Sequence, residues 1–214
     1  MSTRRILVLN PKGGCGKTTL AVNIASFYAN QGKSVVLADF DPQGSAMEWI
    51  KARPETYDTI KRIPAWKGDL RLPRDIDYLV MDAPAAVHGR EISNLLKRAE
   101  SVVIPVLPSP VDIRAAAHFI EDILLNKRVS HKNTKLAVVA NRVRENTIVY
   151  QKLQRFLKRL DIPFVAVFRD TQNYIRAAER GISIFEMAPS MVTQDLDQWR
   201  SLTRWLNSKR SLPG

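Results

Sequence analysis

Residues 10–19 read NPKGGCGKTT. This segment follows a short apolar run at residues 6–9 and precedes residues 17–30, where apolar side chains recur at helical spacing. Glycines let the backbone wind tightly and turn its N–H groups toward an anion. The N-terminus of the predicted helix adds the positive end of a dipole. The segment is therefore predicted to be a phosphate-binding loop between a strand and a helix.

The polar residues of this loop suit nucleotide phosphates. Lys17 can reach the β- and γ-phosphates, and the Thr18 hydroxyl can coordinate Mg²⁺. The strict motif has a glycine where this chain has Pro11, and this chain carries an extra lysine, Lys12, which is either redundant or directed elsewhere. Cys15 is either simply small enough to fit, or a thiolate favoured by the helix N-terminus and the two lysines. The predicted nucleotide contacts within the loop are Gly13, Gly14, Cys15, Gly16, Lys17, Thr18 and Thr19.

The rest of the chain alternates apolar runs with amphipathic segments. Runs rich in Val, Ile and Leu occur at residues 35–38, 78–81, 102–107, 136–140 and 163–168. Helical spacing occurs at residues 45–53, 91–99, 111–125, 147–160, 174–180 and 194–207. Continuous apolar strands between such helices are typical of a sheet that is covered on both faces. We therefore predict an α/β fold, a doubly wound, mainly parallel sheet with helices on both faces, in one domain over residues 1–214.

Composition excludes several classes of protein. A single cysteine among 214 residues rules out a disulfide framework and any iron–sulfur or zinc site that needs two thiolates from one chain. The amino-terminal apolar run is too short for a signal peptide, and no run reaches the roughly 18–20 apolar residues of a membrane span. We expect a cytoplasmic protein.

Positive charge is concentrated in one part of the chain. The whole sequence has 33 Lys and Arg against 21 Asp and Glu, a formal net charge of +12. Residues 127–160 contain ten basic residues and one acidic residue, Glu145, so the net charge of this stretch is 10 − 1 = +9. A solvated helix face is one interpretation, but acidic partners at four-residue spacing are missing. The excess favours a polyanion-binding surface. Its members are Lys127, Arg128, Lys132, Lys135, Arg142, Arg144, Lys152, Arg155, Lys158 and Arg159.

Three carboxylates stand at predicted strand ends. Asp82 ends a buried strand, where an unpaired carboxylate is costly unless a cation such as Mg²⁺ compensates it. Asp39 ends another strand and is expected to support Lys17 or the Mg²⁺ shell, and Asp41 follows two residues later. An Asx turn or a helix cap is the alternative for any one of them. All three together indicate a metal-dependent phosphate site.

Four stretches resemble the ParA-type partition ATPases of the deviant Walker A group. They are the loop at residues 11–19, ADFDPQGSA at 38–46, YLVMDAP at 78–84 and IPVLPSPVD at 104–112. They are similar to the family's phosphate loop, its Asp-x-Asp-Pro-Gln-Gly segment, its Walker B strand and its proline-rich strand exit. The tail between residues 169 and 186 also fits the pattern. The resemblance implies a P-loop NTPase that is a short form without an N-terminal helix-turn-helix, so we expect no operator role.

The resemblance implies roles for individual residues. ATP and Mg²⁺ are the expected cofactors, and slow hydrolysis to ADP and phosphate is the expected reaction. Lys12 would reach across an ATP-dependent homodimer to the other subunit's phosphates, and Asp41 would orient the attacking water. Asn141 follows the run at 136–140, where relatives place an adenine-contacting Asn; a plain turn residue is the alternative. The expected catalytic residues are Lys12, Lys17 and Asp41, and the expected metal-site residues are Thr18, Asp39 and Asp82.

The resemblance also implies partners. Relatives bind bulk nucleoid DNA without sequence preference and work with a ParB-like adaptor protein, so a cytoplasmic, nucleoid-associated protein is expected. The cargo is a plasmid, a chromosome or a protein body such as a carboxysome. Phosphate contacts from Lys and Arg need no base readout. The DNA-binding candidates are Arg144 first, then Lys152, Arg155 and Arg159 at helical spacing.

Two other functions remain open. A MinD-like membrane role would use residues 196–210 as a basic amphipathic helix, although a closing helix packed on the sheet is the other interpretation. The Pro42-Gln43-Gly44 sequence is absent from MinD-like chains, so a membrane partner is not expected. A metabolic ligase of the same superfamily would lack a lysine at the position of Lys12, which argues against that role.

Overall fold

One parallel sheet forms the centre of the molecule. The structure is a computed structural model, and it describes residues 3–68, 70–125, 134–159 and 162–213. The strands of the described chain pair in the order β3-β2-β4-β1-β5-β6-β7, and every pair is parallel. Their bounds are β1 Arg4–Val8, β2 Val35–Asp39, β3 Ile60–Pro64, β4 Tyr78–Asp82, β5 Ser101–Val106, β6 Lys135–Val143 and β7 Phe164–Arg169.

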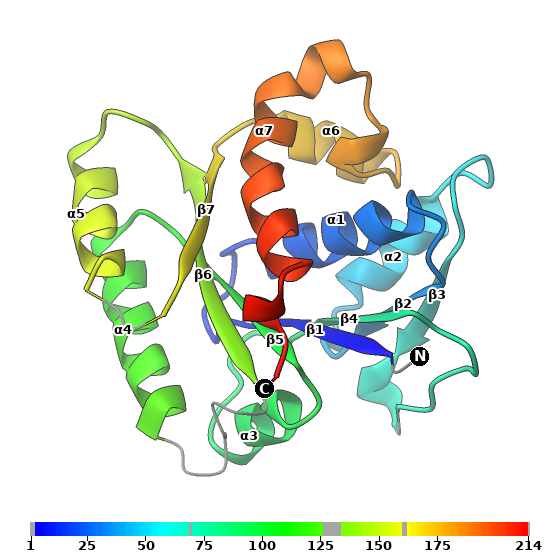
Figure 1. Cartoon of the computed structure of the whole chain (residues 1–214), viewed down its shortest axis with the longest axis horizontal. Helices are drawn as coiled ribbons and strands as arrows, with labels where there is room; N and C mark the ends of the chain where they lie inside the picture. The colour runs from blue at the N-terminus through cyan, green and yellow to red at the C-terminus, as the bar shows by residue number, and fades with distance from the viewer. Residues whose placement is uncertain (1–2, 69, 126–133, 160–161, 214) are drawn as a thin grey trace.

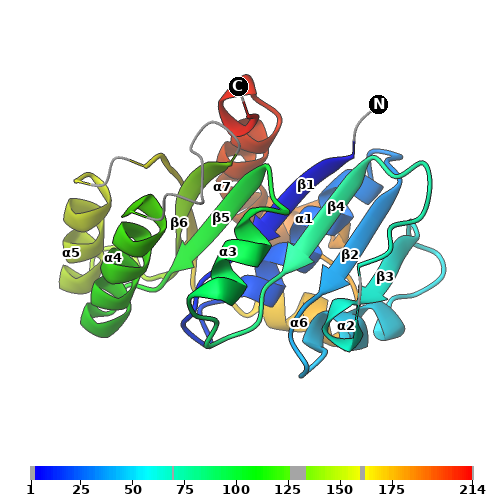
Figure 2. The same cartoon turned by 90° about the horizontal axis from the view of Figure 1, so that it is seen from below.

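Helices cover both faces of this sheet, as Figures 1 and 2 show. Helices α1, α2, α6 and α7 pack on one face, and α3, α4 and α5 pack on the other. Their bounds are α1 Lys17–Ala29, α2 Ser45–Ala52, α3 Arg90–Leu96, α4 Pro110–Leu125, α5 Ile148–Leu157, α6 Asn173–Glu179 and α7 Pro189–Leu206. Short 3-10 turns are η1 Ala65–Lys67, η2 Ile184–Glu186 and η3 Lys209–Ser211. The predicted doubly wound α/β fold is confirmed.

Alternating strand residues build two cores. Ile6 and Val8 of β1 join the core under α1 and α7, whereas Leu7 and the following Leu9 join the core under α3, α4 and α5. All four are fully buried. This explains why the strands read as continuous apolar runs, since a strand with helices on both sides has no solvent face.

Among the predicted boundaries that differ from the structure, two have a clear physical reason. Helix α7 begins at Pro189, five residues before the predicted start at Gln194, and proline suits the first turn because the N–H that it lacks has no helical acceptor. Strand β6 continues to Val143, past the predicted end at Ala140. Its pairing with β7 shifts register between Ala140 and Val143, and Arg142 has φ = 52°. The strand therefore continues through a bulge-like irregularity. The spacing of apolar residues in the sequence does not reveal such an irregularity.

The connections place the site at the carboxyl ends of the central strands. Strand β1 lies between β4 and β5, because the chain first fills the β2–β3 side of the sheet and then crosses to the β5–β7 side. Asp39 and Val8 are both in register with Asp82, so two carboxylates meet beside the end of β1. Ligands of open α/β sheets bind outside such a reversal point.

No helix in the described ranges is both long enough and apolar enough to span a bilayer.

Candidate nucleotide site

The loop between β1 and α1 has a backbone that only glycines allow. Gly14 and Gly16 have φ of 73° and 94°, in the left-handed region that side chains disfavour. A Cβ on Gly16 would also overlap the side-chain amide of Asn141. Gly16 is the N-cap of α1, and no side chain caps that helix within the described structure. The first N–H groups of α1 are therefore free to meet an anion.

The two loop lysines have different surroundings. Lys17 is 7% exposed, and its Nζ donates to the carbonyl oxygen of Lys12 over 3.0 Å. Lys12 has an exposed side chain, while its backbone N–H donates to Asn10 Oδ1 over 2.9 Å. Asn10 in turn donates to the carbonyl of Pro105 at 2.7 Å. The loop backbone is thus anchored to β5, with one lysine held inside the loop and the other at the surface.

Two of the three predicted metal-site residues, Thr18 and Asp82, contact each other directly. Thr18 Oγ1 donates to Asp82 Oδ2 over 2.6 Å. Asp82 is 1% exposed, and its Oδ1 has no hydrogen-bond partner among the described residues. Burial raises the pKa of Asp82 to about 7, against the opposing effect of the Thr18 hydrogen bond, and the neighbouring Asp39 raises it further. A hydroxyl beside an unpartnered carboxylate oxygen fits one side of a Mg²⁺ shell.

The rest of such a shell must come from other oxygen atoms. Among the described residues, no group of three or more His, Cys, Asp or Glu side chains could hold a metal ion. Mg²⁺ usually keeps several waters and is bound by one or two protein groups together with substrate phosphates. The donor set therefore fits a metal that arrives with a nucleotide.

Asp39 supports the turn that follows β2. Its side chain is fully buried, and it accepts the N–H of Asp41 at 2.9 Å and the N–H of Ala46 at 3.1 Å. Burial raises its pKa, and these two hydrogen bonds oppose that shift. The hydrogen bond from Ala46 satisfies an N–H in the first turn of α2, which Gly44 precedes. Asp39 therefore holds the segment that carries Asp41.

Asp41 connects two loops of the site. Its Oδ1 accepts the N–H of Gln43 at 2.9 Å, and its Oδ2 accepts the N–H of Ala85, after β4, at 3.3 Å. The N–H of Gly44 donates to the Asp41 carbonyl at 2.9 Å, which closes the turn. The carboxylate is half-buried and lies between the segments that follow β2 and β4.

Asn141 holds the phosphate loop. Its Nδ2 donates to the carbonyl of Cys15 at 2.8 Å, and the residue is 6% exposed. It lies inside the end of β6, whereas the sequence predicted a residue after the strand. It also lines a cavity of about 300 Å³ with Gly14, Gly16 and Thr19. The structure therefore places Asn141 against the phosphate loop, with its amide nitrogen committed to the loop backbone, and the predicted adenine contact stays a prediction.

An ion pair between half-buried Arg169 and buried Asp195 lies at this cavity and was not predicted from the sequence. Arg169 lines the cavity and donates from Nε and Nη2 to the two carboxylate oxygens of Asp195, at 2.6 and 3.0 Å. Asp195 is fully buried on α7 and also accepts from Asn173 Nδ2 at 2.7 Å. A signal was present, because Asp195 shares the buried spacing of Val192, Trp199, Leu202 and Leu206. A lone acid at such a position needs a cationic partner.

Cys15 has the surroundings of a protonated thiol. It is 1% exposed, and its Sγ–H donates to the carbonyl of Lys12 at 3.2 Å. Burial raises the pKa of this thiol, and the nearby Lys17 only partly offsets that effect. The thiolate interpretation is therefore wrong, and the interpretation of a small residue that fits the loop agrees with the structure.

The predicted DNA-binding residues lie in two different places. Arg144 pairs through Nη2 with Asp170 Oδ2 at 2.9 Å, and both line the cavity beside Asn141. Lys152 and Arg155 are exposed on α5, and Arg159 is exposed just after that helix. Lys127, Arg128 and Lys132 lie outside the described residues. The structure therefore places Arg144 beside the candidate nucleotide cavity and the other three on and after α5.

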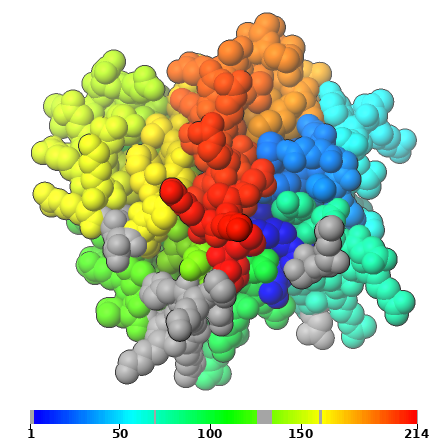
Figure 3. Space-filling model, viewed as in Figure 1, coloured from blue at the N-terminus to red at the C-terminus, as the bar shows by residue number. Residues whose placement is uncertain are grey.

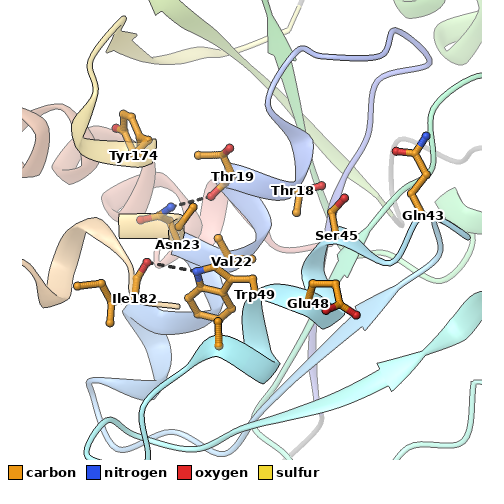
Figure 4. Close-up of a pocket in the computed structure, with 12 residues that line it drawn as sticks. Thr18, Thr19, Val22, Asn23, Gln43, Ser45, Glu48, Trp49, Tyr174 and Ile182 are labelled. Atoms are coloured by element: carbon orange, nitrogen blue, oxygen red, sulfur yellow. Dashed lines mark hydrogen bonds between the residues drawn. The ribbon is translucent and has the colours of Figure 1, made fainter. Parts of the chain in front are cut away.

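A second cavity lies next to the phosphate loop and is lined in part by Thr18 and Thr19. Figure 4 looks into this space of about 430 Å³, which is lined by residues of α1, α2 and α6. Asn23 Nδ2 donates to the carbonyl of Thr19 at 2.7 Å, and Trp49 Nε1 donates to that of Ile182 at 3.2 Å. These bonds, dashed in Figure 4, brace the first turns of α1 and tie α2 to the segment after α6.

Comparison with known proteins adds three findings. The family model described as the CobQ/CobB/MinD/ParA nucleotide binding domain matches residues 6–184. The chain is 30% identical to the maintenance of carboxysome distribution protein A of Halothiobacillus neapolitanus, over 85% of this chain and 87% of that protein. It is 32% identical to the protein of the same name from Gloeobacter kilaueensis, over 86% of this chain and 84% of that protein.

A solved structure agrees with the fold. A plasmid partition protein of Borrelia burgdorferi B31, bound to AMPPNP, superposes with a TM-score of 0.73. The alignment covers 95% of this chain and 99% of that chain, at 15% identity. At this identity the likeness concerns the fold alone.

Proposed function

The chain belongs to the family of CobQ/CobB/MinD/ParA nucleotide-binding domains, and we propose that it acts as a ParA-like ATPase over the single domain 1–214. It binds ATP with Mg²⁺, forms an ATP-dependent homodimer and holds non-specific DNA in that state. Slow hydrolysis to ADP and phosphate, stimulated by a ParB-like adaptor, releases the DNA. The cycle positions a cargo on the nucleoid.

The observation that carries this proposal is the pairing of Thr18 with Asp82 at the end of the glycine loop. The hydroxyl donates to one carboxylate oxygen, and the other oxygen is buried without a partner in the described structure. Mg²⁺, when bound with ATP, supplies positive charge against the phosphates and this carboxylate. The loop N–H groups bind phosphate oxygens, and Lys17 leaves the Lys12 carbonyl to bind them as well.

Asp41 suits the role of orienting the attacking water. Its carboxylate lies between the turn after β2 and the segment after β4, held by the N–H groups of Gln43 and Ala85. The buried carboxylate of Asp39 holds that turn in place by accepting the backbone N–H groups of Asp41 and Ala46. A carboxylate held in this way accepts a proton from water and aligns it for attack without a large rearrangement.

Lys12 supports the proposed dimer. Its backbone N–H is anchored to Asn10, while its side chain is exposed to solvent. A surface lysine on an anchored phosphate loop is suited to bind phosphates that belong to a second subunit. ATP is then shared between two chains, which explains why dimer formation depends on it.

Helix α5 supports the proposed DNA surface. Lys152 and Arg155 are exposed, Arg159 follows them, and no carboxylate of the described chain pairs with any of the three. Unpaired surface cations bind phosphates through counterion release, which is independent of sequence and weakens with salt. Arg144 joins this surface from the edge of the nucleotide cavity, where it pairs with Asp170.

The structure gives no support to the MinD-like alternative. Most apolar residues of α7 are packed inside the protein, with Trp199 and Leu202 fully buried and Trp205 7% exposed, whereas Met191 in its first turn is 50% exposed. The helix therefore offers no continuous apolar face to lipid. For the cargo, two relatives are named for carboxysome distribution, which supports a protein body, and a plasmid or a chromosome stays within the proposal.

Binding to random-sequence duplex DNA tests this function. The protein is titrated with ATP and Mg²⁺, and then with ADP and Mg²⁺, over a series of salt concentrations. Tight, salt-sensitive binding with ATP alone is expected. Equal binding in both nucleotide states, or none in either, would contradict the DNA switch, and binding to anionic liposomes would then favour the membrane role.

A further inference from the structure

A third cavity lies beside the turn that carries Asp41. It measures about 420 Å³ and opens between that turn, helix α2 and the end of β3. Its walls include Pro42, Pro64 and Trp66, so proline rings and an indole supply its apolar surface. Strand β3 is one of the two edge strands of the described sheet. The cavity is therefore open to a partner that approaches from this edge.

Among the residues that the structure describes, three cations and one carboxylate line the cavity. Lys51, Arg62 and Lys67 line it, against Glu48 alone, and all four are exposed. Glu48 already pairs with Lys51 at 2.5 Å. Arg62 and Lys67 have no carboxylate within ion-pair distance in the described structure, and Lys67 Nζ lies 5.9 Å from the Trp66 ring centroid. The cavity therefore presents uncompensated positive charge beside an aromatic ring.

Trp66 packs directly against the turn that carries Asp41 and Gly44. Gly44 has φ = 68°, and a Cβ placed on it would lie 3.2 Å from the Trp66 ring, so the indole packs against the bare backbone of the turn. The same Gly44 donates its N–H to the carbonyl of Asp41. A ligand that moves or clamps Trp66 therefore acts on the residue proposed to orient the attacking water.

We propose that this cavity binds an acidic, proline-containing peptide segment of a partner protein and that its occupation changes the rate of ATP hydrolysis. The charge of the walls selects carboxylates. Grooves lined by aromatic side chains take extended proline-rich segments, which lose little entropy on binding. This inference rests on the proposed ATPase function and gives that function a site for regulation by a partner.

The position of the cavity distinguishes it from the proposed DNA surface. Figures 1 and 2 both place β3 and α2 at one side of the molecule and α5 at the other. Figure 3 shows these two regions as separate surfaces, cyan on one side and yellow-green on the other. A concave site of this volume suits a few side chains better than a duplex backbone. A peptide bound here leaves α5 free for DNA.

The test uses a fluorescein-labelled peptide, Glu-Glu-Pro-Pro-Glu-Glu, and fluorescence anisotropy with the full chain without nucleotide. Arg62→Glu with Lys67→Glu should weaken binding about tenfold, since two screened attractions to the peptide are removed. Lys152→Glu with Arg155→Glu on α5 makes the same change in net charge and should change binding less than about twofold. An equal weakening in both variants, or none in the first, would overturn the proposed site.

Two further measurements complete the test. A milder variant, Arg62→Gln with Lys67→Gln, should also weaken peptide binding, but by less than the Glu variant does. Both cavity variants should keep the thermal unfolding midpoint of the wild type. A short oligothymidylate that loses more affinity than the peptide in the cavity variant would assign the site to nucleic acid and overturn the peptide assignment.

The effect on hydrolysis is measured separately from binding. The peptide should change the ATP hydrolysis rate of the wild type and leave that of the cavity variant unaltered. Peptide binding that depends on Arg62 and Lys67 without any change in rate would overturn the coupling to Asp41. Because the binding assay contains no nucleotide, a chain that hydrolyses no ATP would contradict the proposed function while the binding result stands.

Discussion

The phosphate loop and helix α5 both carry lysines, but their surroundings differ. Lys17 is 7% exposed, and its ammonium is held 3.0 Å from a loop carbonyl. Lys152 and Arg155 are exposed, without a carboxylate partner in the described chain. A group with fixed partners acts in a defined geometry, so removing it affects chemistry strongly. Exposed charges act through their sum, so removing any one of them has a small effect.

The largest effect is expected at Asp41. Asp41→Ala removes the carboxylate proposed to orient the attacking water and should lower ATP hydrolysis about 100-fold. ATP binding should persist, so the protein should remain as a DNA-bound dimer in the presence of ATP and Mg²⁺. Phosphate release and DNA retention are measured in parallel, with Asp58→Ala, at an exposed position before β3, as the control. Normal hydrolysis in Asp41→Ala would remove this residue from the mechanism.

A smaller but specific effect is expected at Lys12. Lys12→Ala removes a charge-assisted hydrogen bond to the phosphates of the other subunit and should weaken the ATP-dependent dimer at least about tenfold. ATP binding by the monomer should change little, because Lys17 and the loop N–H groups remain. Sedimentation velocity with ATP and with ADP measures the dimer, and Lys33→Ala serves as an exposed control. Dimers of normal affinity in Lys12→Ala would refute the cross-subunit role.

The smallest effects are expected on α5. Lys152→Gln or Arg155→Gln should each weaken DNA binding a few-fold and lower the slope of log affinity against log salt by about 0.9 for each phosphate that the variant no longer neutralises. Arg144→Gln should weaken DNA binding similarly and also change ATP affinity, since its partner Asp170 lines the nucleotide cavity. A single α5 substitution that abolishes DNA binding would break the distinction between the two regions.

Dependence on tertiary partners also separates the features that could be predicted from the sequence from those that could not. Apolar runs and the glycine loop predict the helices, the position of the P-loop residues and every strand of the described sheet except β3, because these patterns follow directly from burial and backbone geometry. Strand β3 has exposed Lys61 and Arg62 at its centre and no continuous apolar run. The irregular end of β6 was not predictable, since the register shift and the positive φ of Arg142 depend on pairing with β7. The loop contact of Asn141 depends on the same feature.

Residues that act through tertiary partners were the hardest to predict. The pairing of Arg169 with Asp195 joins residues 26 positions apart, and no local pattern specifies it. The state of Cys15 depended on burial at the base of the loop, which local charge alone does not indicate. The early start of α7 at Pro189 could have been inferred, because proline favours the first turn of a helix.

The central claim is that Thr18 and Asp82 form one side of a Mg²⁺ site used only with nucleotide. Calorimetric titration of ATP into the wild type and into Asp82→Asn, each with excess Mg²⁺ and with EDTA, tests it most directly. Asparagine keeps the size of the side chain and an acceptor for Thr18 but loses the charge. We expect Mg²⁺ to strengthen ATP binding about tenfold or more in the wild type and to have little effect in the variant. The same Mg²⁺ dependence in both proteins would contradict the account.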